Sequence, residues 1–224
     1  MPWLEYAGLI LLSYLIGSIP FGWIIVKIST GKDIRNIESG RTGGTNAMRA
    51  AGCLAGAATA VLDFLKGAVV GWWIANYYAP TNYWLQILAP IAAVMGHNYS
   101  IYFLESRKGA LYLRGGAGGA PAFGGIFALY QPSLFILLPI IALVFVLTGY
   151  ASLTTISIGL GAILLFVIRN LQGVSPWEYI LYGVAVEIIV LWALRPNLAR
   201  LIKGNERRVN ILTFIKQGNK NGKV

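Results

Sequence analysis

The sequence predicts an all-α protein, a polytopic integral membrane helical bundle of seven transmembrane helices, one of them short. Composition points to lipid: 57% of the 224 residues are hydrophobic and the mean hydropathy is +0.66. Only 12% of the residues are charged, against about a quarter in soluble domains. A bilayer core takes about 20 apolar residues per helix, so one domain of this length has room for roughly six or seven crossings.

Seven apolar segments are the candidate spans. They are Leu4–Val26, Leu54–Tyr78, Trp84–Leu104, Pro121–Tyr130, Leu134–Thr148, Ala151–Ile168 and Trp177–Leu194. The first has no basic leader or small-residue cleavage site before it, so it is expected to be a retained helix. The fourth is short, and we expect a half-span or tilted helix packed inside the protein, where irregular backbone is tolerated.

Lysine and arginine residues predict the orientation. With the N-terminus outside and seven crossings, 16 of the 18 basic residues fall on the inner face, while Arg169 lies outside and Lys66 lies within a span. Cytoplasmic loops are enriched in basic residues, so the C-terminus is predicted to be cytoplasmic. Residues 205–224 would form a basic cytoplasmic tail that lies on the membrane as a short amphipathic helix or is partly disordered.

Several function classes find little support. The net charge of +10 suggests nucleic acid, but the basic residues lie between or after spans, which favours anionic lipid head groups. One histidine, one cysteine and eight scattered carboxylates form no zinc or magnesium pattern, so neither metal nor cofactor is predicted. Cys53 is expected to be a small packing residue. The glycine-rich segments are not a P-loop, because no Gly-Lys-Ser/Thr follows.

Two loops rich in glycine and arginine are the candidate functional elements. The first reads Glu38-Ser-Gly-Arg-Thr-Gly-Gly-Thr-Asn-Ala-Met-Arg49 and the second Arg114-Gly-Gly-Ala-Gly-Gly-Ala-Pro121. Glycine lets backbone N–H groups turn toward an anion, while arginine supplies charge and Ser, Thr and Asn supply hydrogen bonds. Both loops are predicted on the cytoplasmic face, which suggests a site for a phosphorylated molecule. Turn formation is the alternative role of Ser39 and Asn46.

Charged and polar residues within spans are costly, so each is a functional candidate. Asp63 and Lys66 lie three apart on one helical face. They form either a structural ion pair or a group whose lysine helps to hold an anion. His97, the only histidine, is either a packed core residue or the imidazole of a catalytic site. Glu187 and Arg169 receive no role.

Six motifs follow one another along nearly the whole chain. They are Ser18-Ile-Pro-Phe-Gly22, the loop Ser39–Arg49, Leu62-Asp-Phe-Leu-Lys-Gly67, Gly96-His97, Tyr150–Thr155 and Asn197-Leu-Ala-Arg-Leu-Ile-Lys-Gly-Asn-Glu206. Together they resemble the motifs of the acyl-phosphate-dependent glycerol-3-phosphate acyltransferases of bacteria. These are small seven-span membrane enzymes with an external N-terminus.

The resemblance implies transfer of a fatty acyl group from acyl phosphate to the sn-1 hydroxyl of glycerol 3-phosphate. The products would be 1-acylglycerol 3-phosphate and phosphate, in the first step of phospholipid synthesis. Residues 1–204 would be the membrane-embedded acyltransferase domain, in the cell inner (plasma) membrane with the site facing the cytoplasm. The expected partners are glycerol 3-phosphate, acyl phosphate and membrane lipids, with no nucleic acid, and a monomer is the expected state.

Matching the motifs residue by residue assigns roles. The expected catalytic residues are Ser39, Arg49, Asn197 and His97. The expected substrate-binding residues are Thr45, Asn46, Lys66, Arg114, Gly115, Gly116, Gly118 and Ser152. The first loop would hold glycerol 3-phosphate, the second would cradle the acyl-phosphate group, and Asn197 and Ser152 would orient the reacting groups. Acyl phosphate is already activated, so the protein needs mainly to align the substrates and stabilise charge.

Three positions depart from the family's motifs. Ala117 stands where the family has a phosphate-binding lysine, Leu194 where it has a histidine, and Arg41 where it has an asparagine. Arg107 and Lys108, in an interval longer than the family's, are candidates for a replacement cation. The alternative prediction is therefore a non-catalytic or altered homologue that carries or binds a phosphorylated small molecule or lipid.

Overall fold

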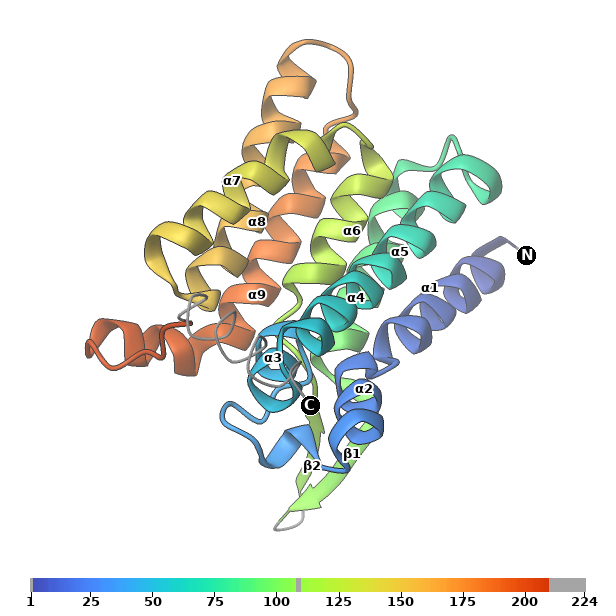
Figure 1. Ribbon diagram of the computed structural model, residues 1–224. Helices are drawn as coiled ribbons and strands as arrows, with labels where there is room; N and C mark the ends of the chain where they lie inside the picture. Colours follow the sequence, from blue (N-terminus) through green and yellow to red (C-terminus); the bar gives the residue numbers. More distant parts are fainter. Residues whose placement is uncertain (1, 108–109, 210–224) are drawn as a thin grey trace.

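The computed structural model describes residues 2–107 and 110–209 and shows a helical bundle with one antiparallel β-hairpin (Figure 1). The α-helices are α1 (Pro2–Ser18), α2 (Phe21–Thr30), α3 (Gly44–Ala51), α4 (Cys53–Trp73), α5 (Tyr83–Asn98), α6 (Gly119–Leu129), α7 (Ser133–Thr148), α8 (Ala151–Leu171) and α9 (Glu178–Ile202). The strands are β1 (Ser100–Arg107) and β2 (Ala110–Arg114), and the short turns are η1 (Ile34–Asn36) and η2 (Ile74–Tyr78).

Four helical stretches of the described chain are long and apolar enough to cross a membrane. They are Trp3–Thr30, Cys53–Tyr78, Ala151–Leu171 and Glu178–Ile202. Helices α6 and α7 are apolar but shorter. By length and composition these helices confirm the prediction of a mostly helical, membrane-embedded bundle. The count of seven crossings and the direction of the termini stay predictions.

A break at Ile19 and Pro20 divides the first predicted span into α1 and α2. Proline lacks an N–H donor and disfavours helical backbone at the residue before it, so the helix ends there. Because the helix ends there, the carbonyl of Ile19 is available to a distant partner. The Lys66 ammonium donates to it at 3.1 Å. The break in the first span therefore helps to hold a buried lysine of α4.

The third predicted span, Trp84–Leu104, is wrong beyond Asn98, where a single β-hairpin is added to an otherwise helical fold. Helix α5 ends at Asn98, and the chain continues as β1, whose Leu104 pairs with Leu113 of β2. Side chains alternate along this strand: Phe103 is 6% exposed, whereas Tyr102 is 57% exposed. Hydropathy counts apolar residues but not their period, so it cannot distinguish a strand rich in aromatic and branched residues from the end of an apolar helix.

Helix α6 lies in the middle of the bundle, between α4 on one side and α8 and α9 on the other (Figure 1). Eight of its 11 residues are buried, which fits the short helix predicted inside the protein. Glycine allows the close approach to α4. A Cβ on Gly67 would lie 2.1 Å from the Pro121 carbonyl oxygen, and one on Gly124 would lie 2.1 Å from that of Phe64.

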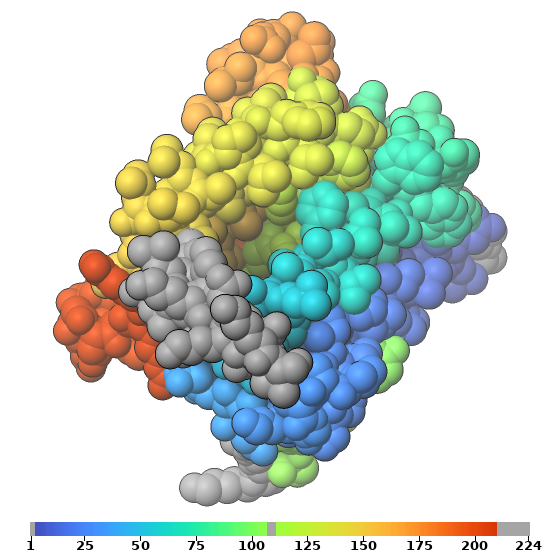
Figure 2. Space-filling model, viewed as in Figure 1, coloured from blue at the N-terminus to red at the C-terminus, as the bar shows by residue number. Residues whose placement is uncertain are grey.

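The largest apolar core lies between α6, α8 and α9. Phe166, Tyr182 and Val186 are completely buried there. The Tyr182 hydroxyl donates to the Ala122 carbonyl at 2.9 Å, so the one polar atom of this side chain is satisfied. Figure 2 shows that the molecule is nevertheless hollowed between α4 and α7, with α6 at the bottom of the hollow.

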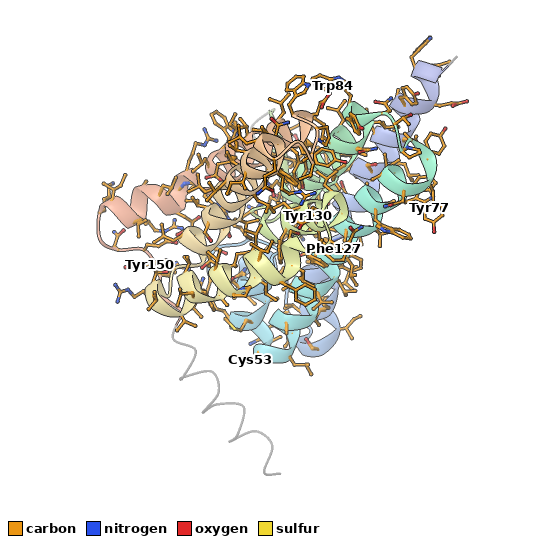
Figure 3. The ribbon with its side chains drawn as sticks, turned by 90° about the horizontal axis from the view of Figure 1, so that it is seen from above. Cys53, Tyr77, Trp84, Phe127, Tyr130 and Tyr150 are labelled. Carbon is orange, nitrogen blue, oxygen red and sulfur yellow. The ribbon has the colours of Figure 1, made fainter. Side chains whose placement is uncertain are left out.

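Aromatic side chains gather at one end of the bundle, where η2, the start of α5 and the start of α9 meet. The exposed members are Trp72, Trp73, Tyr77, Tyr78, Tyr83, Trp84 and Trp177. Figure 3 shows Tyr77 and Trp84 on the side of the molecule away from Cys53 and Tyr150. Tryptophan and tyrosine are enriched where a membrane meets water, so this belt is typical of one membrane interface.

Candidate active site

A cavity of about 680 Å³ opens into the hollow between α3, α4, α6, α7 and α8, and we call it the main cavity. Its polar lining includes Ser39, Arg41, Thr45, Asn46, Arg49, Asp63, His97, Ser152 and Asn197. Its apolar lining includes Val61, Phe64, Leu65, Phe123, Leu134, Leu138, Phe145 and Ile158. One cavity thus joins cationic, hydrogen-bonding groups to a wall suited to a hydrocarbon chain.

The first glycine/arginine loop presents Ser39 on a tight turn. Glu38 has φ +49° and Gly40 has φ +66°, so the residues on both sides of Ser39 adopt left-handed backbone. A non-glycine residue at such a φ is uncommon and is held there by its surroundings. Here Glu38 forms an ion pair with Arg207. The turn is therefore fixed from the C-terminal segment, and Ser39 lines the cavity between these two left-handed residues.

Asn46 organises the same loop from the first turn of α3. Its Nδ2 donates to the carbonyls of Arg41 at 2.8 Å, Ile37 at 3.0 Å and Ile34 at 3.2 Å. These contacts match the turn-forming role that was the alternative for this residue. Its Oδ1 is buried and finds no partner among the described residues. Asn46 thus fixes the loop with one atom and leaves the other for a ligand.

Two arginines of this loop carry the charge of the main cavity. Burial lowers the pKa of both Arg41 and Arg49 from its ordinary value, and for Arg49 the nearby Glu38 opposes that shift. Arg41 donates from Nη2 to the Ala193 carbonyl, and Arg49 donates from Nη2 to the Arg207 carbonyl at 3.5 Å. Guanidinium groups stay protonated at such positions, so the cavity keeps a positive charge that an anion would neutralise.

Asp63, Lys66 and His97 form a buried cluster under the main cavity. The Lys66 ammonium lies 2.8 Å from Asp63 Oδ1 and 2.8 Å from His97 Nδ1, and Asp63 Oδ1 is 3.4 Å from His97 Nδ1. Asp63 and His97 line the cavity, whereas Lys66 lines neither this cavity nor the second one described below. Lys66 therefore contacts protein groups, as the structural ion-pair interpretation expected.

The cluster determines where His97 carries its proton. An ammonium only donates hydrogen bonds, so Nδ1 accepts from Lys66 and a neutral ring holds its proton on Nε2. That nitrogen faces the second glycine loop, because a Cβ on Gly116 would lie 1.8 Å from Nε2. Gly116 in turn donates its N–H to the His97 carbonyl at 2.9 Å. His97 and Gly116 thus hold each other in place.

The second glycine/arginine loop lies beside the first. The Thr42 N–H donates to the Gly115 carbonyl at 3.3 Å, which joins the two loops. Gly118 has φ +88°, a conformation that favours glycine, and it lines the main cavity. Arg114, Gly115 and Gly116 instead line a second cavity of about 520 Å³, which we call the side cavity. The four predicted residues of this loop are therefore divided between two cavities.

Asn197 and Ser152 reach the main cavity from α9 and α8. Asn197 Nδ2 donates to Glu206 Oε1 at 2.6 Å, and Arg200 Nε donates to Glu206 Oε2 at 3.0 Å. The Ser152 hydroxyl and Asn197 Oδ1 are buried and lack a partner within the described part of the chain. Buried polar atoms are rarely left unpaired, so both atoms are available to a ligand.

All three positions that depart from the family's motifs, Arg41, Ala117 and Leu194, line the main cavity. Lys108, one candidate for a replacement cation, lies outside the described residues. For Arg107 the structure gives the backbone, which pairs with Ala110 at the end of the hairpin. Within residues 2–107 and 110–209, no group of three or more His, Cys, Asp or Glu residues is placed to hold a metal ion.

Comparison with known proteins identifies the family. A family model described as glycerol-3-phosphate acyltransferase matches residues 7–204. The chain belongs to this family. "Glycerol-3-phosphate acyltransferase 3" of Dehalococcoides mccartyi (strain CBDB1) is 35% identical, covering 90% of this chain and 94% of that protein. The glycerol-3-phosphate acyltransferase of Aquifex aeolicus is 32% identical, covering 89% of this chain and 97% of its own.

Solved structures agree with the sequence relatives. The glycerol 3-phosphate form of PlsY (YgiH), an integral membrane glycerol 3-phosphate acyltransferase, superposes with a TM-score of 0.81 at 29% identity. Its lysophosphatidic acid form gives a TM-score of 0.77 at 27% identity. Each comparison covers 94% of this chain and 98% of the solved chain. The resemblance inferred from the six motifs is confirmed, and the alternative of a carrier or binder is not favoured.

Sequence reasoning missed the roles of two residues near this site. Glu206 matched a motif but received no role, and Asn98, which lines the side cavity, was not singled out. Asp63 was a functional candidate of the sequence, and the structure adds that it lines the main cavity. Glu206 lies nine residues after Asn197, and no local rule of spacing relates two residues on either side of a helix end. Asn98 follows His97 directly, and a polar residue at the end of an apolar helix was the available signal.

Proposed function

We propose that this chain transfers a fatty acyl group from acyl phosphate to the sn-1 hydroxyl of glycerol 3-phosphate. The observation that carries the proposal is the main cavity, in which a cationic loop and an apolar wall meet in one space. Glycerol 3-phosphate needs the cationic end, and the acyl chain needs the wall. Each buried CH₂ group contributes about 0.8 kcal/mol to binding of the chain.

The cationic end supports placing glycerol 3-phosphate there. Arg49 would pair with its phosphate, while Ser39 and Thr45 would donate hydrogen bonds to its oxygens. Hydrogen bonds to a charged group contribute about 1.5–3 kcal/mol each. Ser152 and Asn197, whose buried oxygens have no partner in the described chain, would orient the reacting hydroxyl. Gly118 of the second loop, which lines the main cavity, would lie against the acyl-phosphate group. Arg114, Gly115 and Gly116 line the side cavity and would have no part in this step.

In the reaction, the sn-1 oxygen attacks the acyl carbonyl carbon, and the bond from that carbon to the phosphate oxygen breaks. The hydroxyl proton leaves with the phosphate. His97 is poorly suited to take this proton, because Lys66 donates to Nδ1 and Nε2 already carries a hydrogen. A phosphate oxygen of the substrate is therefore the base, and the protein acts by alignment and charge stabilisation. The products are 1-acylglycerol 3-phosphate and phosphate.

The placement in the cell follows from the same proposal. Both glycine/arginine loops lie at the end of the bundle opposite the aromatic belt, and the positive-inside rule directs basic loops to the cytoplasm. The site would then open to the cytoplasm from the inner membrane, with seven crossings and an external N-terminus. Residues 1–204 would act as one membrane-embedded domain and a monomer, followed by the basic tail of residues 205–224.

The test is a direct assay of the full chain purified in detergent. Palmitoyl phosphate and glycerol 3-phosphate are supplied, and lysophosphatidic acid is followed by mass. We expect product from the wild type, none from Ser39→Ala, and normal turnover from Ser175→Ala at the opposite end of the bundle. If well-folded wild-type protein makes no product with acyl chains of several lengths, the proposed function is wrong.

Arg49→Ala examines the charge of the site separately. Removing the guanidinium that would pair with the phosphate of glycerol 3-phosphate should lower kcat/KM by about 100-fold or more. Arg169→Ala, which removes an arginine stacked on Tyr130 at the far end of the bundle, is the matched control and should retain activity. Near-normal turnover by Arg49→Ala would exclude Arg49 from the phosphate site.

A further inference from the structure

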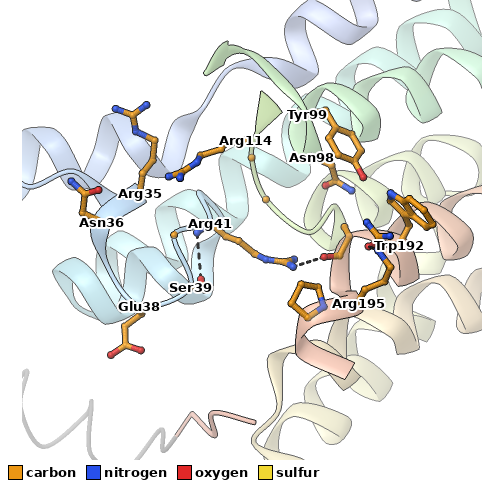
Figure 4. Close-up of a pocket in the computed structure, with 15 residues that line it drawn as sticks. Arg35, Asn36, Glu38, Ser39, Arg41, Asn98, Tyr99, Arg114, Trp192 and Arg195 are labelled. Atoms are coloured by element: carbon orange, nitrogen blue, oxygen red, sulfur yellow. Dashed lines mark hydrogen bonds between the residues drawn. The ribbon is translucent and has the colours of Figure 1, made fainter. Parts of the chain in front are cut away.

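The side cavity lies beside the main cavity and is separated from it by the first loop. Ser39 and Arg41 line both cavities, so they form the wall between them. Figure 4 shows the Arg41 side chain running along the side cavity from the loop that carries Ser39 toward the α9 residues. The proposed reaction uses the main cavity, which leaves a second polar space of about 520 Å³ without a role.

Asn98 is the most informative residue of this space. Its side chain is 4% exposed, yet neither its Nδ2 nor its Oδ1 has a partner in the described chain. A buried amide without hydrogen bonds costs about 1–3 kcal/mol, so both atoms are available to a ligand that can donate and accept. The carboxamide lies close to the second glycine loop, because a Cβ on Gly118 would come within 2.9 Å of Oδ1. It therefore lies near the wall between the two cavities.

Charge in the side cavity favours an anion. Four arginines and one glutamate line it within the described residues: Arg35, Arg41, Arg114, Arg195 and Glu38. The carboxylate of Glu38 pairs with Arg207. Arg35 and Arg114 have the carboxylate partners Asp33 and Glu105. Arg41 differs from them, because its Nη2 is anchored on the Ala193 carbonyl while its Nη1 is buried without a partner in the described chain.

The lining also limits the size and polarity of the ligand. None of the described residues around the side cavity is Leu, Ile, Val, Met or Phe, and Trp192 is covered by the Arg195 guanidinium at 3.4 Å. The apolar members of its lining are Tyr99, Trp192, Ala193 and Pro196, which offer a hydrocarbon chain much less than the aliphatic and aromatic wall of the main cavity. A small, water-soluble anion fits instead, one that accepts from Arg41 and Asn98 Nδ2 and donates to Asn98 Oδ1. Monoprotonated phosphate has both kinds of oxygen.

We propose that the side cavity is a second phosphate subsite, in which Asn98 and Arg41 bind the inorganic phosphate that the reaction releases. The proposal rests on the proposed function for the source of the phosphate, whereas the binding itself depends only on the cavity. Phosphate released in the main cavity would move past the Arg41 side chain into the side cavity. There it would be bound away from the reacting centre. Product phosphate would then leave without crossing the acyl chain.

The test is a titration of the full chain in detergent with inorganic phosphate by isothermal calorimetry, with saturating glycerol 3-phosphate present to fill the main cavity. Asn98→Leu, which keeps the volume and removes both polar atoms, should weaken phosphate binding by about tenfold or more. Arg41→Gln should weaken it similarly. Asn76→Leu, at an exposed amide on η2, should bind phosphate as the wild type does. Asn197→Leu, which alters the main cavity alone, should also retain phosphate binding.

Each outcome decides the proposal. Equal phosphate affinity in Asn98→Leu and the wild type, or absence of phosphate binding by the wild type, overturns it. If Asn98→Leu fails to fold, the smaller change Asn98→Ala decides by the same criterion, because Asn98 lines the side cavity alone. Weaker binding of lysophosphatidate micelles to Asn98→Leu, by the same factor as phosphate, would assign the cavity to a lipid head group and overturn the free-phosphate assignment.

The acyltransfer and the phosphate subsite can be disproved independently of each other. A chain that makes no lysophosphatidate but binds phosphate through Asn98 disproves the acyltransfer and keeps the subsite. A chain that makes lysophosphatidate but binds phosphate equally well with and without the Asn98 side chain supports the acyltransfer and disproves the subsite.

Discussion

Gly116 shows how much of this site depends on the absence of a single side chain. The backbone at Gly116 lies against the His97 ring, and the two residues are joined by a hydrogen bond from the Gly116 N–H to the His97 carbonyl. Lys66 and Asp63 hold the other side of the ring. Both ring nitrogens of His97 thus have neighbours, with Lys66 and Asp63 at Nδ1 and Gly116 at Nε2. The position of the ring therefore determines where the second glycine loop lies.

Gly116→Ala should therefore abolish most of the activity. A Cβ would lie 1.8 Å from His97 Nε2, so either the ring or the loop must move. We expect acyltransfer to fall by about 100-fold, because a shift of about 1 Å in a positioning group costs that much. The measurement is lysophosphatidate formation together with the thermal midpoint in detergent. Gly8→Ala is the control, because no atom of the described residues lies within 4 Å of the added Cβ, and normal activity in both variants would contradict this account.

At the scale of elements, the turn η1 links the first loop to the hairpin. Asp33 caps the turn by accepting from the Arg35 N–H at 2.9 Å, and its Oδ2 pairs with the Arg35 guanidinium at 2.7 Å. Arg35 also pairs with Glu105 of β1 at 3.2 Å and lies over the Phe103 ring. One arginine therefore holds the segment before the first glycine/arginine loop against a strand residue 70 positions away.

This link predicts a dependence of stability on acid. The hydrogen bond with Arg35 lowers the pKa of Asp33 from 3.8 to about 2. Because the folded pKa is depressed, the interaction stabilises the protein above pH 3.8 and is lost as the pH falls toward 2. The difference in thermal midpoint between wild type and Asp33→Asn should be full at pH 6 and vanish near pH 2, as followed by tryptophan fluorescence. A difference that is constant over this range would contradict the assignment.

Helices α4 and α6 pack closely together, and this contact bears on the site because α6 begins at the second glycine loop. It depends on Gly67 and Gly124, each of which meets a carbonyl oxygen of the opposite helix. Small residues of this kind let helix backbones approach closely within a membrane. Phe64 of α4 and Phe123 of α6, which both line the main cavity, stack edge to face with ring centroids 5.5 Å apart.

Gly124→Ala should destabilise the protein and widen the cavity. Its Cβ would lie 2.1 Å from the Phe64 carbonyl oxygen, and overpacking of this kind costs about 1–3 kcal/mol. For a chain of this size the midpoint falls by about 2–4 °C per kcal/mol. The thermal midpoint in detergent measures the effect. Gly173→Ala offers no matched control, because Gly173 has φ +71°, so Gly8→Ala serves again. A midpoint unchanged within error would contradict the packing account.

On the scale of the whole molecule, the bundle has two different ends. One carries the aromatic belt of η2, α5 and α9, and the other carries both glycine loops, the hairpin and the arginines (Figure 1). Residues that are distant in sequence meet at the second end: Val209 donates its N–H to the Gly149 carbonyl at 2.8 Å, and Glu206 accepts from Asn197. This asymmetry is what the positive-inside rule detected in the sequence.

The single cysteine offers a test of the orientation. Cys53 is exposed at the start of α4, on the end that carries the loops, rather than packed as the sequence suggested (Figure 3). A membrane-impermeant maleimide should label it in inside-out vesicles and not in right-side-out vesicles. Val174→Cys in a Cys53→Ser background, at the α8–α9 connection, should give the opposite pattern. The reverse of both patterns would show that the N-terminus lies inside.

The sequence by itself determined the membrane bundle, the cationic end and the family, because these depend on composition, on the order of apolar segments and on short motifs. Only the tertiary structure decided that Lys66 lies beneath the cavity, that Glu206 reaches Asn197, and that the chain after Asn98 turns into a strand. The physical reason is that hydropathy and spacing report the environment of a residue averaged over its neighbours in the chain. Burial of a polar atom without a partner, as at Asn98, arises from contacts between elements that are distant in sequence.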